Sequence, residues 1–192
     1  MTFDLSIVLE KLRPNSKWSF LGRTYNDIVW HDEFQTKPTE EEVVQKIAEL
    51  EYQEEVNEYQ RQRAAEYPAY ADQFDKIFNE GIDAWKADIQ ATKDKYPKAT
   101  MDATELQTRK DKAIFDLQTE RYVAATKRLE LDAVVASDDI PATVEVSTTN
   151  PETMEVTTET VTNPVIVKDE EERAAAQAVV DATPQPVIDS LN

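Results

Sequence analysis

Aromatic side chains are confined to the first 136 of the chain's 192 residues, and residues 137–192 contain none. The same C-terminal segment has twelve acidic residues against two basic ones, a net −10 of the chain's formal −18. A segment so acidic and so poor in large apolar groups buries too little surface to offset the entropy lost on ordering. We therefore expect the hydrophobic core before residue 137, and residues 137–192 to be disordered or ordered by a partner.

The C-terminal segment nevertheless has a pattern of its own. Eight threonines fall between positions 143 and 162, and threonine and valine favour extended backbone. Asn-Pro pairs, which mark turns, end at Pro151 and Pro164. We predict an extended acidic tail whose strands add to a partner's sheet, followed by a short helix over 169–182 with its acids at a solvated N-terminus. The valines expected to contact the partner are Val144, Val146, Val156 and Val161.

Several classes of function are disfavoured by residue types that the chain lacks. Two glycines, Gly22 and Gly81, are too few for a loop that cradles phosphate, and the absence of cysteine excludes disulfides and thiolate chemistry. The single histidine, His31, has no catalytic or metal-ligand pattern around it, and no acidic cluster has the alternation of a calcium loop. We predict no catalytic residue, no metal and no cofactor, and therefore a protein that is not an enzyme.

The acidic net charge bears on partners and location. It repels a phosphate backbone and an anionic membrane surface, so neither nucleic acid nor a membrane is an expected partner. No apolar run approaches the roughly 20 residues of a membrane span, and the N-terminus, with Asp4 and Glu10, lacks the basic start of a signal peptide. We expect a soluble protein that is made in a cytoplasm.

The window KWSFLGRTYNDIVWHD, residues 17–32, concentrates aromatic and β-branched residues. Two such runs around Gly22 predict a β-hairpin with strands at 17–22 and 24–31. We expect these aromatic residues to form mainly the core of the hairpin, with their exposed side as a candidate contact surface. The candidates are Trp18, Tyr25 and Trp30.

Helical signals flank the hairpin on both sides. A short helix or turn over 4–12 precedes it. Thr39 and Glu42 have the spacing of a capping box, so a helix is predicted over 40–66. A loose apolar seam, interrupted by charge, predicts another helix over 102–135.

The strongest apolar stripe lies on a helix predicted over 69–95. Its members are Phe74, Ile77, Phe78, Ile82, Trp85 and Ile89. Gly81 inside the stripe costs a helix about 1 kcal/mol relative to alanine, which close packing would offset. A break of the helix near residues 79–82 is the alternative. We expect the stripe to be mainly core, with a partner interface as the second option; the candidates there are Phe74, Phe78 and Trp85.

These elements define the expected fold class as mainly α with a small N-terminal β-hairpin (α+β), with elongated helices and an extended acidic Thr/Val-rich C-terminal tail. Three segments are expected. A hairpin plus helical unit occupies residues 1–98, a long helix occupies 99–136, and the tail occupies 137–192.

Five motifs in the first half of the chain occur in a recognisable order. They are the hairpin pattern Trp18, Gly22, Tyr25, Asp27-Ile28, Trp30 and Asp32, then QTKPTEEE at 35–42, YQRQRAAEYP at 59–68, DQFDKIF at 72–78 and WKADIQATKDKYPK at 85–98. In this order, over about residues 5–98, the chain resembles small proteins encoded in the tail and structural regions of bacteriophages, notably marine and cyanobacterial phages. The resemblance implies a non-enzymatic protein of the virion or of tail assembly, and no functional residue carries over from it.

The resulting expectation is a virion structural protein associated with the tail, neck or fibre. It would be present in multiple symmetric copies and held by contacts with other phage structural proteins. Its location would be the virion, and the host cytoplasm during assembly. An alternative is a tail or tail-fibre assembly chaperone that leaves before the virion is complete. A distant alternative is an acidic DNA mimic that blocks a host DNA-binding protein.

Overall fold

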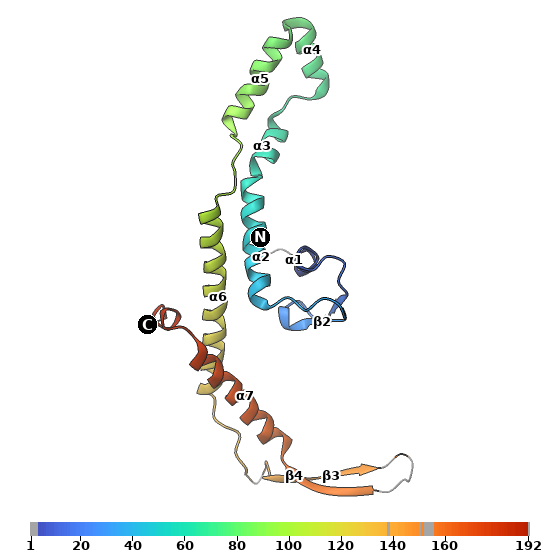
Figure 1. The fold of residues 1–192 in the computed structure, drawn as a ribbon, viewed down its shortest axis with the longest axis vertical. Helices are drawn as coiled ribbons and strands as arrows, with labels where there is room; N and C mark the ends of the chain where they lie inside the picture. Colours follow the sequence, from blue (N-terminus) through green and yellow to red (C-terminus); the bar gives the residue numbers. More distant parts are fainter. Residues whose placement is uncertain (1–3, 138, 150, 152–155, 192) are drawn as a thin grey trace. The chain divides into compact units, whose positions relative to one another are not determined.

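The computed structural model describes residues 4–137, 139–149, 151 and 156–191 (Figure 1). Its described elements are mainly helical with two small antiparallel hairpins, so the predicted mainly-α class with an N-terminal hairpin is confirmed. The chain forms two compact units, Met1–Ile114 and Phe115–Asn192, which divide within helix α6, Ala103–Glu130. The segment boundaries predicted from composition lie elsewhere in the sequence. Composition does not locate this division, because one continuous helix can take part in the packing of both units.

Unit 1 begins with helix α1, Leu5–Leu12. The carboxylate of Asp4 caps this helix by accepting a hydrogen bond from the backbone N–H of Ser6 at 2.8 Å. The helix ends at Arg13, since the following proline disfavours α backbone in the residue before it.

The N-terminal hairpin consists of β1, Trp18–Phe20, and β2, Ile28–Trp30, with Trp18 opposite Trp30. Both strands are shorter than predicted, because a 3₁₀ turn, η1, occupies Tyr25–Asp27. The Asp27 carboxylate accepts hydrogen bonds from the N–H and hydroxyl of Thr24, which holds this turn. A Cβ at Gly22 would collide with the Asp27 carboxylate, so a larger residue there would displace the group that holds this turn.

The core of unit 1 combines side chains from α1, β2 and α2. Its buried members are Val8, Leu9, Ile28, Val43 and Leu50. Full burial of such a side chain stabilises a fold by roughly 1.5–3 kcal/mol. Partly buried apolar residues that pack against this cluster are Leu5, Leu12, Trp18, Phe20, Tyr25, Trp30 and Ile47.

Helix α2, Glu40–Val56, starts at the predicted capping box. The Thr39 hydroxyl accepts a hydrogen bond from the Glu42 N–H at 3.2 Å, and the Glu42 carboxylate accepts one from the Thr39 N–H at 2.8 Å. The single helix predicted over 40–66 is interrupted at Asn57, and α3 continues over Glu58–Glu66.

The helix predicted over 69–95 is also two helices, α4, Tyr70–Glu80, and α5, Ile82–Lys95. Gly81 separates them with φ +89° and ψ 166°, a backbone conformation that is essentially restricted to glycine. Of the two alternatives for Gly81, the structure has the break. Helices α4 and α5 fold back on each other, and α3 contacts α5 (Figure 1). We call α3, α4 and α5 together the helical arm.

Ionic contacts join α2 to the part of α6 that belongs to unit 1. Lys110 pairs with Glu49 at 2.8 Å, and Arg109 pairs with Glu55 at 2.7 Å. The hydroxyl of Tyr52 accepts a hydrogen bond from the Asp102 N–H at 3.1 Å. These interactions explain why the seam predicted on α6 is rich in charge.

Unit 2 contains the rest of α6, a second hairpin and two helices. The hairpin pairs β3, Thr143–Thr149, with β4, Val156–Thr162, and it is followed by α7, Pro164–Ala182, and α8, Gln185–Asp189. The expectation from the sequence was a tail that is disordered or ordered by a partner, with strands that add to a partner's sheet. The Thr/Val segments pair with each other instead.

Helix α7 also begins five residues earlier than the predicted start at Asp169. The side chain of Asn163 caps it by accepting a hydrogen bond from the Val165 N–H, and Pro164 occupies the first helical turn. Asp169 consequently lies inside α7 and is buried, rather than at a solvated N-terminus. Its carboxylate binds Arg128 and accepts a hydrogen bond from the Val134 N–H at 3.0 Å.

Candidate protein-docking surface

The aromatic residues of the N-terminal hairpin are half-buried against the core of unit 1. The rings of Trp18 and Phe20 lie 5.1 Å apart. The indole N–H of Trp30 donates to the Gln35 carbonyl at 2.6 Å, and the hydroxyl of Tyr25 donates to the Pro38 carbonyl at 2.8 Å. Because the polar ends of Tyr25 and Trp30 already bind backbone, these side chains offer a partner little beyond their exposed edges.

His31 has a serine neighbour that the sequence pattern does not reveal. Its Nε2 lies 2.8 Å from the Ser19 hydroxyl, across the two strands of the hairpin. Both residues are exposed, and within the described part of the chain no carboxylate binds the His31 ring. Nucleophilic catalysis by a Ser–His pair requires a group that orients the imidazole and a site that binds the oxyanion. The contact is a surface cross-strand hydrogen bond.

The described residues were searched for metal-binding groups and for helices that could span a membrane. Among them there is no group of three or more His, Cys, Asp or Glu side chains with the geometry to hold a metal ion. Nor does any helix in the described ranges combine the length and apolarity required to cross a membrane.

Polar contacts join the helices of the helical arm. The indole N–H of Trp85 on α5 donates to Gln73 Oε1 on α4 at 3.0 Å, and Lys76 pairs with Asp88 at 2.5 Å. The hydrogen bond with Asp88 is the largest cause of the raised pKa of Lys76. Arg63 of α3 donates to the carbonyl of Tyr96 just beyond α5 at 2.8 Å. These contacts fix the direction in which the apolar residues of α4 face.

The outer face of α4 carries an exposed aromatic stripe, which corrects the expectation that Phe74 and Phe78 are core. Of the other members of the predicted stripe, Ile82 is exposed, whereas Ile77, Trp85 and Ile89 are half-buried. Phe74 is 69 % exposed and Phe78 is 88 % exposed. Tyr70, one turn before Phe74, is exposed as well, and so is Ile82, the first residue of α5 beyond the break at Gly81. The i, i+4, i+8 spacing of Tyr70, Phe74 and Phe78 places the three rings along one side of the helix. We call Tyr70, Phe74 and Phe78 the α4 stripe.

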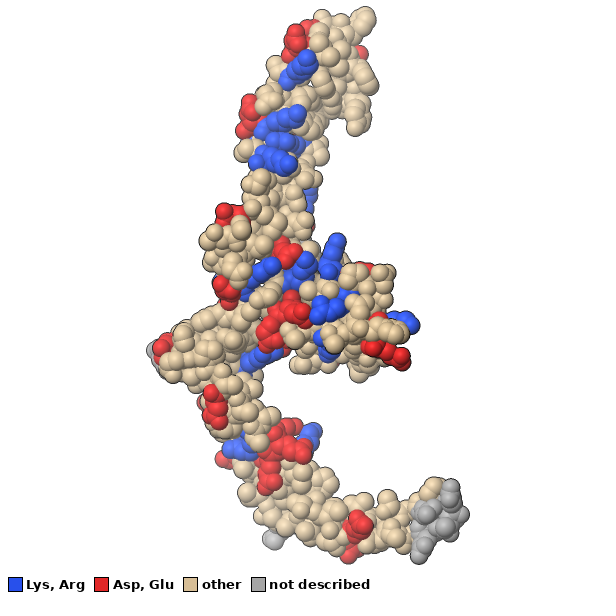
Figure 2. All heavy atoms as spheres, in the orientation of Figure 1, with Lys and Arg blue, Asp and Glu red and all other residues tan. Residues whose placement is uncertain are grey.

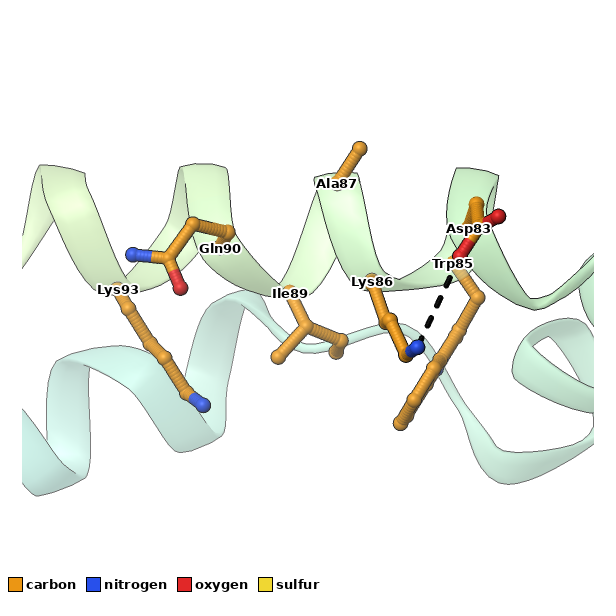
Figure 3. Close-up of a pocket in the computed structure, with 7 residues that line it drawn as sticks. All are labelled: Asp83, Trp85, Lys86, Ala87, Ile89, Gln90 and Lys93. Atoms are coloured by element: carbon orange, nitrogen blue, oxygen red, sulfur yellow. Dashed lines mark ion pairs between the residues drawn. The ribbon is translucent and has the colours of Figure 1, made fainter.

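A shallow hollow lies beside α5 (Figure 3). Its volume is about 500 Å³, and its lining combines the apolar surface of Trp85 and Ile89 with two amines, Lys86 and Lys93. Lys86 pairs loosely with Asp83 at 3.7 Å. A second hollow of about 580 Å³ shares Ile89 and Lys93 and extends toward the junction of α3 and α4. Open hollows of this kind suit the side chains of a protein partner better than an enclosed small molecule.

Charge is distributed unevenly over the helical arm. Figure 2 shows basic side chains gathered over α5. The charged residues of α4 itself are Asp72, Asp75, Lys76 and Glu80. The arm therefore combines exposed aromatic side chains on α4 with basic side chains over α5.

The four valines predicted as partner contacts in the C-terminal segment do not all lie on one face of the β3–β4 hairpin. The register pairs Val144 with Val161 and Val146 with Glu159, so Val144, Val146 and Val161 share one face of the hairpin. Val156 pairs with Thr149 on the opposite face. Val144 and Val161 are half-buried, whereas Val146 and Val156 are exposed.

The sequence predicted Phe74 and Phe78 as interface residues only as the second option, after a place in the core. Two features around them were not predicted. Tyr70 lies one helical turn before Phe74, and this i, i+4 spacing is the signal that identifies it. The hollow beside α5 is lined by residues of that helix alone, and no local sequence pattern reveals it. Comparisons of the chain with protein-family models, with curated proteins and with solved structures found no match.

Proposed function

We propose that the chain is a non-enzymatic structural protein of a bacteriophage virion, associated with the tail, neck or fibre, and that it acts by docking to other phage structural proteins. The phage origin rests on the order of motifs over about residues 5–98. The docking role rests on the α4 stripe, whose aromatic rings have no cover in the described chain.

The energetics of the stripe support a docking role. Buried aromatic side chains dominate many protein–protein interfaces, since each ring removes a large apolar area from water at low cost in side-chain entropy. Phe78 is 88 % exposed, so almost all of its apolar area is removed from water only when a partner covers it. Contiguous exposed apolar patches on soluble proteins mark interaction sites. Several symmetric copies of the chain would present this stripe repeatedly on an assembling particle.

The distant alternative of a DNA mimic is less well supported. A mimic needs unpaired carboxylates spaced like phosphates, whereas acids of α2 and α3 are occupied by bases within the chain. Glu49 binds Lys46 and Lys110, and Arg61 binds Glu54 and Glu58. The assembly chaperone has the same docking chemistry as a structural protein and differs only in leaving the particle.

Mass spectrometry of purified particles of the encoding phage tests the proposal. A stoichiometric amount of the chain relative to the major capsid protein is the expected result. Absence from particles, combined with abundance in infected cells, would replace the structural role with the chaperone. Recovery in the host cytoplasm without any association with phage proteins would contradict both.

The α4 stripe is tested separately by the double variant Phe74→Ser, Phe78→Ser. Because both rings are exposed, each substitution should change the free energy of unfolding by no more than about 0.5 kcal/mol. Incorporation into particles should nevertheless fall strongly. Phe34→Ser is the matched control, since Phe34 is 95 % exposed and lies outside the helical arm. Normal incorporation of the double variant would remove the stripe from the docking mechanism.

A further inference from the structure

The β3–β4 hairpin has one regular register over seven residue pairs, from Thr143 opposite Thr162 to Thr149 opposite Val156. Each strand carries a single acid, Glu145 or Glu159, within a segment of unit 2 that is otherwise strongly acidic. The remaining strand residues are threonine, valine and serine, all of which are compatible with a pleated surface. The hairpin is therefore a nearly uncharged, regular ribbon.

One backbone hydrogen bond fixes which groups of β3 face outward. The Asn163 N–H donates to the Ala142 carbonyl at 3.0 Å, so residues 142 and 163 form a hydrogen-bonded pair. Such pairs alternate along an antiparallel ladder. The N–H and C=O groups of Val144 and Val146 therefore point toward β4, and those of Glu145 and Ser147 point away from it.

This outer edge of β3 lacks the features that protect edge strands. Natural edges are blunted by lysine, proline, bulges or a covering element. Residues 143–149 contain no lysine, proline or glycine, and the described register has no bulge. A hairpin of only two strands is marginally stable, most residues of β3 and β4 are exposed, and Val146 is 43 % exposed. A third strand on this edge would satisfy the backbone and cover apolar surface.

We propose that the outer edge of β3 pairs antiparallel with β3 of a second copy of the chain, about a two-fold axis at Val146. In this register Glu145 of one copy lies opposite Ser147 of the other, and Thr143 lies opposite Thr149. Glu145 and Ser147 are the residues whose N–H and C=O groups face outward, so they form the hydrogen-bonded pairs. Val146 meets its symmetry mate in a close non-hydrogen-bonded pair, where side chains approach most closely.

Charge selects β3 rather than β4 for this pairing. The centre of β4 is Glu159, so the equivalent symmetric pairing of two β4 strands would place two carboxylates directly opposite each other. Like charges in that position are destabilising. At the β3 edge the centre is a valine, and each Glu145 faces a serine. The second copy is thus favoured by self-complementarity of this one edge.

The net charge of the whole chain should make the stability of the proposed dimer depend on salt concentration. Two copies at −18 each repel one another, and this repulsion is screened over a Debye length of about 8 Å at physiological ionic strength. Since the paired strands themselves carry little charge, salt should strengthen the dimer. The proposal concerns self-association through unit 2 and does not depend on the phage role or on the α4 stripe.

Two proline variants of the full-length chain provide a matched test. The hydroxyls of Ser147 and Thr158 lie 3.0 Å apart across the hairpin, so Ser147→Pro and Thr158→Pro lose the same side-chain hydrogen bond. Each also removes one outward-pointing N–H, but from opposite edges of the hairpin. In sedimentation equilibrium, Ser147→Pro should weaken the dimer by about tenfold or more, because two intermolecular hydrogen bonds are lost. Thr158→Pro should dimerise like the wild type.

Val146→Lys distinguishes an effect on pairing at the β3 edge from an effect on the stability of the hairpin itself. Within one chain the new amine lies opposite Glu159, an attractive cross-strand pair, whereas across the two-fold axis it meets another amine. The variant should keep its hairpin, seen as unchanged circular dichroism, and should lose the dimer. A wild-type chain that remains monomeric in high salt would overturn the proposal. Equal weakening by both proline variants, or weakening by Thr158→Pro alone, would overturn it as well.

Discussion

Arg13 Nη2 lies 3.0 Å from both carboxylate oxygens of Glu42, although 29 positions separate the two residues. Arg13 is the C-cap of α1, and Glu42 belongs to the capping box of α2. One carboxylate therefore joins the end of the first helix to the start of the second. The two helices that it joins contact each other and share the core of unit 1 with the hairpin.

Glu42→Gln should destabilise unit 1 in a pH-dependent way. The Thr39 N–H and then Arg13 hold the pKa of Glu42 below its ordinary value of 4.5. A carboxylate with a lowered pKa stabilises the fold above its unfolded pKa, and that contribution is lost as pH falls through the folded pKa. Glutamine still accepts from Thr39, so the loss at neutral pH should be roughly 0.5–1 kcal/mol in urea unfolding.

The difference between Glu42→Gln and the wild type should shrink as the pH falls below 4.5 and through the lowered pKa of Glu42, because the carboxylate then becomes protonated. Glu33→Gln serves as the control, because Glu33 is an exposed acid that belongs to neither helix. A difference that stays constant with pH would show that the charge of Glu42 does not stabilise the junction.

The two tryptophans of the hairpin should respond differently to replacement by phenylalanine. Trp30 Nε1 donates to the Gln35 carbonyl at 2.6 Å, whereas Trp18 Nε1 is buried without a hydrogen-bond partner. Trp30→Phe loses a hydrogen bond that Trp18→Phe does not, so it should cost about 1 kcal/mol more in the free energy of unfolding. Each variant is the control for the other. Equal losses in denaturant titrations would indicate that the Gln35 contact contributes nothing.

Local signals predicted the parts of the fold that local chemistry determines. The capping box requires only Thr39 and Glu42, three positions apart, and α2 begins where their spacing indicates. The hairpin at Trp18 and Trp30 was likewise predicted from β-branched and aromatic runs around one glycine. In both cases the determining groups are close in sequence.

The predictions that failed depend on groups far apart in the chain. Periodicity showed that Phe74 and Phe78 share a helix face, but it does not tell whether another element covers that face. Asp169 was assigned to solvent because its partner, Arg128, lies 41 positions away. The Thr/Val segments were recognised as extended, but that they pair with each other depends on their register, which propensity does not specify.

Gly81→Ala should convert α4 and α5 into one continuous helix. Nothing lies within 4 Å of a Cβ at Gly81, so the substitution meets no steric barrier other than the backbone conformation itself. At φ +89° alanine is strained by about 1–3 kcal/mol, and in a helix it gains about 1 kcal/mol over glycine. Both effects favour the straight form, which separates Lys76 from Asp88.

Spin labels measure this change without interference, since the chain has no cysteine of its own. Labels at Asp72→Cys and Gln90→Cys lie on helices that fold back on each other. In a continuous helix the same backbone positions are about 27 Å apart along the axis. The label distance should therefore increase in the Gly81→Ala background, and an unchanged distance would show that the interhelical contacts outweigh the backbone strain.

Asp169→Asn should destabilise unit 2 more than any other neutralisation of an acid on α7. The buried Asp169 carboxylate binds Arg128 with one oxygen and accepts the Val134 N–H with the other. These bonds, first the one from Val134 and then the one from Arg128, lower the pKa of Asp169. An amide retains the size of the side chain but leaves the Arg128 charge without its close partner. The matched control is Glu172→Gln, since Glu172 binds the same guanidinium at 3.3 Å from a more exposed position.

Thermal unfolding followed by circular dichroism distinguishes the two neutralised variants. Asp169→Asn should lower the melting temperature clearly at neutral pH, and Glu172→Gln should change it little. Since the pKa of Asp169 is lowered on folding, its stabilising contribution is present above pH 3.8, the ordinary value, and is lost on further acidification. The wild type should therefore approach Asp169→Asn in acid. Equal melting temperatures for the wild type and Asp169→Asn at neutral pH would mean that the pair with Arg128 does no more than offset the cost of burying the carboxylate.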